Sequence, residues 1–163
     1  MSVRDAFVWL DANLPGGQWL RESIFGFGFS LTAHVLTMCL FLGLIVVMDL
    51  RLVRLAYLKT PAAEIQKRLF PSQMLGFALV TISGLVLFYA QPLRYYGKGF
   101  FWLKMVLMVL AGVNAFVIHR LTHRSEAAWD SKAAKFAGLV SLVLWAAIVC
   151  SGRLVAYGWW TYQ

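Results

Sequence analysis

The chain has 163 residues, of which 61% are hydrophobic and 13% are charged, and its mean hydropathy is +0.71. This composition excludes an ordinary soluble domain and indicates a membrane protein. The formal net charge of +8 does not indicate a nucleic-acid partner, because the basic residues lie in short connectors beside apolar segments. In such connectors, basic residues contact anionic membrane lipid and produce the charge bias that orients membrane proteins.

The N-terminal stretch predicts a short amphipathic helix on the membrane surface. Val3, Phe7, Leu10 and Leu14 recur at helical spacing, and the run ends at the Pro-Gly-Gly of residues 15–17. The stretch lacks the basic start and short apolar run of a cleavable signal peptide.

Four apolar segments predict four membrane-spanning helices, with approximate bounds 24–50, 73–90, 100–119 and 133–155. No internal repeat, low-complexity tract or domain boundary interrupts them. We therefore predict an all-α fold, in which residues 1–163 form one integral membrane four-helix bundle with a short N-terminal interfacial helix.

The connector before the second span predicts a short interfacial helix of its own. Thr60 and Pro61 have the residue types of an N-cap and a first helical turn, and Pro71 then opens the span. Three small residues of this span predict close approach to another membrane helix, and they are Gly76, Ser83 and Gly84.

Lysine and arginine are more frequent in the first and third connectors than elsewhere. The positive-inside rule places these connectors in the cytoplasm and both termini in the periplasm of a bacterial inner membrane.

The main candidate site residue is His34, because an ionisable side chain near the middle of an apolar span is costly to bury. His34 lies roughly 5 Å outward of the centre of its span, and Lys104 roughly 7 Å outward of the centre of the third, so the two are at one level. His119 lies at the other end, roughly 20 Å away. One cofactor can therefore contact both His34 and Lys104, while His119 is a candidate for a second, cytoplasmic cofactor site. His119 and His123 lie four residues apart in a basic connector, where an interfacial pair that contacts lipid headgroups is favoured over a pair of ligands.

Each candidate also has a simpler interpretation. His34 can hydrogen-bond across helices, and its potential partners are Thr81, Ser83 and Asn114. Lys104 can serve as an anchor at the outer interface. Copper bound by His34, Met38 and Cys39 is disfavoured, because Cys39 lies about 140° around the helix from His34.

Several short motifs together resemble a superfamily of four-helix bacterial membrane proteins. The superfamily includes the HemJ-type protoporphyrinogen oxidases and the membrane part of CopD-like copper-resistance proteins. The motifs are His34, Asp49-Leu50-Arg51-Leu52, Lys67-Arg68-Leu69, Phe88 and Phe101-Trp102-Leu103-Lys104-Met105. Ala111-Gly112-Val113-Asn114 and His119 are closer to an uncharacterised group of this superfamily that shares the D-L-R-L motif.

The resemblance implies a haem site. A first-helix histidine and a third-helix lysine are implicated in haem b binding by the HemJ type, and the matching positions are His34 and Lys104. After its first helix the HemJ type carries the run L-P-R-L-F-V-Y-H, whereas residues 49–56 here read D-L-R-L-V-R-L-A. The resemblance therefore extends to haem binding and not to porphyrinogen oxidation.

These observations lead to two hypotheses of different classes. In the first, the chain is a b-type haem protein with His34 as an axial ligand and Lys104 as the second ligand or a propionate partner. It would transfer single electrons between quinone or a periplasmic donor and a partner redox subunit, as a monomer or an oligomer. In the second, it is a cofactor-free accessory subunit of a larger membrane complex.

Overall fold

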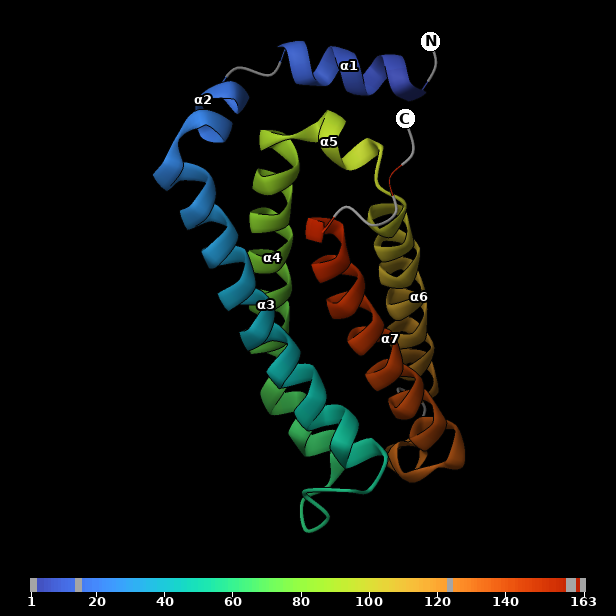
Figure 1. Ribbon diagram of the computed structural model, residues 1–163. Coiled ribbons are helices and arrows are strands. Elements are labelled where there is room, and N and C mark those ends of the chain that lie inside the picture. The colour runs from blue at the N-terminus through green and yellow to red at the C-terminus, as the bar shows by residue number, and fades with distance from the viewer. Residues whose placement is uncertain (1–2, 14–15, 123–124, 158–160, 162–163) are drawn as a thin grey trace.

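The computed structural model describes residues 3–13, 16–122, 125–157 and 161. Within these residues every regular element is helical, and Lys98 and Thr161 form an isolated β-bridge. The all-α prediction is therefore confirmed. The elements are α1 (Val3–Asn13), α2 (Gly17–Glu22), α3 (Ile24–Leu52), α4 (Ala62–Ala90), α5 (Pro92–Tyr96), α6 (Gly99–Thr122), the 3₁₀ helix η1 (Glu126–Asp130) and α7 (Lys132–Tyr157) (Figure 1).

Four of these helices are long and apolar enough to cross a membrane. The candidate spans are Phe25–Leu52, Ala62–Ala90, Gly99–Arg120 and Lys132–Val155, and each contains an 18-residue stretch of high hydropathy with at most two charged residues. Large apolar side chains cover their outer surfaces, and Phe25, Phe29 and Leu40 are 86%, 77% and 70% exposed. An apolar surface of this extent needs lipid around it, so the protein is a multi-pass membrane protein.

The spans form two hairpins that meet along one seam. α3 packs mainly on α4 and α6 on α7, while the contact between α3 and α7 joins the two hairpins (Figure 1). Small residues permit this close packing. A Cβ atom added to Gly76 would lie 3.2 Å from the Cβ of Phe41, and one added to Gly138 would lie 2.8 Å from the Cβ of Leu52.

The second spanning helix is longer than its sequence predicts. The expected interfacial helix and the expected span form one continuous helix, α4, with Pro71 in its interior and Pro61, rather than Thr60, at its N-cap. An interior proline removes one backbone hydrogen bond, which the 29 residues of α4 tolerate. Pro71 therefore lies within α4 and does not mark the start of a helix.

The best-buried part of the protein lies where the first and third connectors meet, at the end of the bundle remote from α1 (Figure 1). Its apolar cluster comprises Met48, Leu52, Ala62, Ile65 and Ala134. Beside the cluster, the buried Arg51 donates to the Thr60 carbonyl at 2.8 Å and to the Asp130 carboxylate at 3.1 Å. These bonds tie the first connector to η1.

The opposite end is covered by α1, which lies across the tops of the spans (Figure 1). The Phe7 ring lies 5.8 Å from the Phe88 ring, 5.0 Å from Tyr96 and 6.2 Å from Trp102, measured between centroids. The predicted N-terminal helix is present, and its Phe7 packs on protein rather than on lipid. Aromatic packing thus fixes α1 onto α5 and the ends of α4 and α6.

Candidate functional site

His34 is half-buried on α3 and faces α4, where its Nδ1 atom lies 2.9 Å from the Ser83 hydroxyl. The Ser83 hydroxyl donates its own proton to the Leu79 carbonyl at 2.8 Å. Its oxygen is therefore available to accept a proton from Nδ1–H of His34. In the tautomer that donates from Nδ1 to this oxygen, the Nε2 atom carries a lone pair.

Gly84 provides the space that the His34 ring occupies. A Cβ atom at position 84 would lie 3.2 Å from Cε1 and 3.7 Å from Nδ1 of the ring. Of the three partners that the sequence offers for His34, the structure brings Ser83 to it. Asn114 instead donates to the Ala137 carbonyl on α7 at 3.0 Å.

Lys104 is half-buried near the start of α6, and its side chain runs against α7. A Cβ atom at Gly152 would lie 3.3 Å from the Lys104 Nζ atom and 3.8 Å from its Cδ and Cε atoms. The ammonium group is close enough to His34 for the two to interact electrostatically. Within the described residues Lys104 has neither an ion-pair partner nor a hydrogen bond.

Lys98 holds the end of α7 beside the start of α6. Its Nζ atom donates to the Val155 carbonyl at 2.6 Å. Burial lowers the pKa of Lys98, and the neighbouring positive charge of Arg94 lowers it further. The bond keeps the last turns of α7, which carry Gly152, next to the first turns of α6, which carry Lys104.

His119 does not join this group of residues. It is exposed in the last turn of α6, whereas Lys104 lies in the second turn of the same helix, so His119 is at the other end of the bundle. His123, its predicted companion, lies outside the described residues.

The donor set at His34 and Lys104 suits some metal centres and not others. In the part of the chain that the structure describes, no group of three or more His, Cys, Asp or Glu side chains gathers in one place. Structural zinc and similar bare ions need about four protein ligands. Haem iron needs only one or two, since the porphyrin supplies the others, and an imidazole and an amine within electrostatic range of each other could supply them.

Sequence reasoning missed the burial of Asp49. Its position at the end of the first span indicates an interfacial carboxylate, but the residue is 4% exposed and packs against α7. Ser141 on α7 lies beside the Asp49 carboxylate, and the Oδ2 atom of Asp49 has no hydrogen-bond partner among the described residues. The signal available in the sequence is the small, polar face of α7 formed by Gly138 and Ser141.

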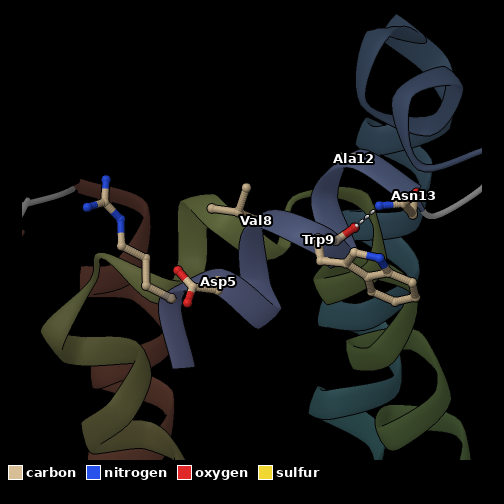
Figure 2. A pocket seen from close by; sticks show the side chains of 6 residues that line it. Asp5, Val8, Trp9, Ala12 and Asn13 are labelled. Carbon is tan, nitrogen blue, oxygen red and sulfur yellow. Dashed lines mark hydrogen bonds between the residues drawn. The ribbon is translucent and has the colours of Figure 1, made fainter. Parts of the chain in front are cut away.

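A shallow depression also lies on α1, on its side facing away from the spans. Figure 2 shows Asp5, Val8, Trp9, Ala12 and Asn13 around it, with the Asn13 amide donating to the Trp9 carbonyl at 2.8 Å. None of the site residues predicted from the sequence lines this depression. The depression is therefore not part of the His34 site.

The sequence matches, over residues 17–158, a family described only as a family of unknown function (DUF6644). No curated protein and no solved structure matches the chain.

Proposed function

We propose that this member of the DUF6644 family of unknown function binds b-type haem between α3 and α6. The bound haem would carry single electrons. The observation that supports this most directly is the hydrogen bond between Nδ1 of His34 and Ser83, because in the tautomer that donates from Nδ1 the Nε2 lone pair would be free to bind iron. Haem supplies one-electron chemistry, and the protein supplies binding and orientation.

The hydrogen bond from His34 to Ser83 is of the kind that metal-binding histidines make. Such histidines almost always donate their other ring N–H to a fixed acceptor, which sets the tautomer and the ring orientation. Ser83 is a fixed acceptor, because its hydroxyl bonds to the Leu79 carbonyl of its own helix. Thr37 supports the arrangement, since its hydroxyl lies 3.3 Å from that of Ser83.

Lys104 is the proposed second ligand, or the partner of a haem propionate. Its amine lies across the bundle near His34 and has no competing partner among the described residues. Gly152 leaves room around the amine, because any side chain there would press on the Nζ atom. Half-burial of an amine within a span is costly, and a ligand that engages it would offset that cost.

Aromatic rings separate the proposed site from water at the α1 end. The Phe88 and Phe101 rings stack at 6.0 Å between centroids, and the Tyr95 ring lies 5.4 Å from Phe101. Exclusion of water would strengthen the bond of a buried amine or imidazole to iron. The same end would be the entry point for an electron donor.

We place the protein in a bacterial inner membrane with both termini on the periplasmic side. The basic first and third connectors support this orientation through the positive-inside rule. The proposed partners are membrane lipid and membrane or periplasmic redox subunits. Contact with such subunits, or between copies of this chain, would use the exposed apolar faces of the spans.

A second candidate is a cofactor-free accessory subunit of a membrane complex. The His34–Ser83 bond also favours this function, because an interhelical hydrogen bond by itself stabilises a membrane hairpin. The two candidates differ in one measurable property, which is haem content.

The test is the haem content of protein purified in detergent from cells with ample haem supply. The proposal predicts about one haem per chain, a loss of most of it in His34→Ala, and retention in His119→Ala, whose histidine lies at the other end of α6. Haem-free wild-type protein would refute the haem proposal and favour the accessory subunit.

A further inference from the structure

A groove lies at the end of the bundle opposite α1, between the end of α3, the first connector and the start of α4. Its apolar wall comes from Val47 on α3 and from Ile65 and Leu69 on α4. Its polar rim carries Lys59, Glu64 and Arg68. The groove thus joins an apolar surface that lies within two membrane spans to a cationic rim at their end.

The charges of the rim are unevenly engaged. Arg68 forms an exposed i,i+4 ion pair with Glu64. Lys59 is exposed and has no ion-pair partner among the described residues. The other connector arginines do not compete for a ligand here, because Arg51 and Arg54 both bind Asp130. Lys59 is therefore the rim cation most available to an anion. Arg68 can leave Glu64 and bind a second oxygen of the same anion.

The connector beside the groove also presents apolar side chains to its surroundings. Leu55, Tyr57 and Leu58 are 74%, 54% and 63% exposed. Apolar residues exposed at the end of a span favour the hydrocarbon boundary over water, while nearby lysine and arginine side chains reach the headgroups. This places the rim at the depth of the lipid phosphates, with Val47 and Leu69 at the depth of the acyl chains.

We propose that this groove binds the headgroup of an anionic phospholipid, with the phosphate at Lys59 and Arg68 and an acyl chain along Val47 and Leu69. Charge complementarity identifies the headgroup, and continuity of the cationic rim with an apolar wall favours a lipid over a soluble anion. The site is independent of the proposed haem site, since it lies at the other end of the bundle and shares none of its residues. Bound lipid would bridge the two helices of the α3–α4 hairpin at the first connector.

The experiment measures the thermal unfolding midpoint of the full chain in nanodiscs of phosphatidylcholine, with and without one third phosphatidylglycerol. For wild-type protein we expect a higher midpoint with the anionic lipid. Titration of detergent-solubilised protein with short-chain phosphatidylglycerol then gives an affinity. We expect that affinity to fall about five-fold in Lys59→Gln and more in Lys59→Gln/Arg68→Gln, following the contribution of one cation near an anionic surface.

Lys67→Gln is the matched control, because Lys67 is an exposed lysine in the same helical turn as Arg68 that does not line the groove. It should retain the wild-type affinity. Lys59 makes no ion pair in the described structure, so Lys59→Gln alone decides the question even if the double variant fails to fold. Equal losses in Lys59→Gln and Lys67→Gln would overturn a defined site in favour of diffuse attraction. An equal stabilisation by inorganic phosphate in phosphatidylcholine nanodiscs would overturn lipid as the ligand.

Discussion

The His34 imidazole on α3 and the Ser83 hydroxyl on α4 are joined by a hydrogen bond of 2.9 Å between Nδ1 and Oγ. This bond orients the ring, and in the tautomer that donates from Nδ1 it leaves a lone pair on Nε2. It also links the two helices of the first hairpin within the membrane. Both proposed functions therefore depend on it, in different ways.

Ser83→Ala should lower the stability of the protein, because it removes the acceptor of the His34 Nδ1 proton. We expect a loss of about 0.5–1.5 kcal/mol, the range for one intramolecular hydrogen bond in a span. The measurement is the thermal unfolding midpoint in detergent. Ser30→Ala is the control, since the Ser30 hydroxyl bonds only to the Gly26 carbonyl of its own helix. An equal loss in both variants would contradict a special role for Ser83.

Gly84→Ala should destabilise the protein, because the new Cβ atom would lie 3.2 Å from Cε1 of His34 and push the ring from its place. Gly112→Ala is the matched control on α6. Its Cβ atom would meet no described atom within 4 Å, so it should be neutral or gain up to about 1 kcal/mol from helix propensity. Unfolding midpoints of the two variants give the comparison, and a Gly84→Ala midpoint at or above that of Gly112→Ala would refute the close packing of His34 on α4.

Asp49→Asn should have an unfolding midpoint equal to or higher than that of the wild type. The side chain is buried, and one carboxylate oxygen has no partner among the described residues. A neutral amide of the same shape costs less to bury than a charged group lacking a partner. Chemical denaturation in mixed micelles offers an independent measurement. A drop of several degrees in the midpoint would show that Asp49 is engaged by a group outside the described contacts.

Asp130→Ala should cost about 1–3 kcal/mol, the range for a hydrogen bond to a charged group, because it leaves the buried Arg51 guanidinium with fewer acceptors. Glu64→Ala breaks the exposed pair with Arg68 and should cost at most about 1 kcal/mol. Unfolding midpoints of the two variants test the difference. A larger effect at Glu64 would contradict the burial of the Arg51–Asp130 contact.

The sequence predicts the four long helices well, because their number and approximate length follow from the apolar runs and the helical rise. His34 and Lys104 lie within electrostatic range of each other, while their common depth in a membrane stays a prediction. The close approach predicted for Gly76 and Gly84 is confirmed, since each packs against a side chain of α3, Phe41 and His34 respectively.

Helix rotation could not be predicted in the same way. The spans are apolar around their whole circumference, so periodicity does not show which face points inward. For that reason Ser83 remained one of three potential partners for His34, and the burial of Asp49 against Ser141 was missed. The prediction that Pro71 opens the span is wrong, because the polar turns before it and the apolar run after it form one continuous helix that accommodates an interior proline.

The most direct test of the central claim is a dithionite-reduced minus oxidised absorption spectrum of purified wild-type protein, His34→Ala and Lys104→Ala. We expect a b-type difference spectrum in the wild type, its loss in His34→Ala, and a spectrum of altered axial ligation in Lys104→Ala. A featureless wild-type spectrum, or a b-type spectrum unchanged in His34→Ala, would contradict it.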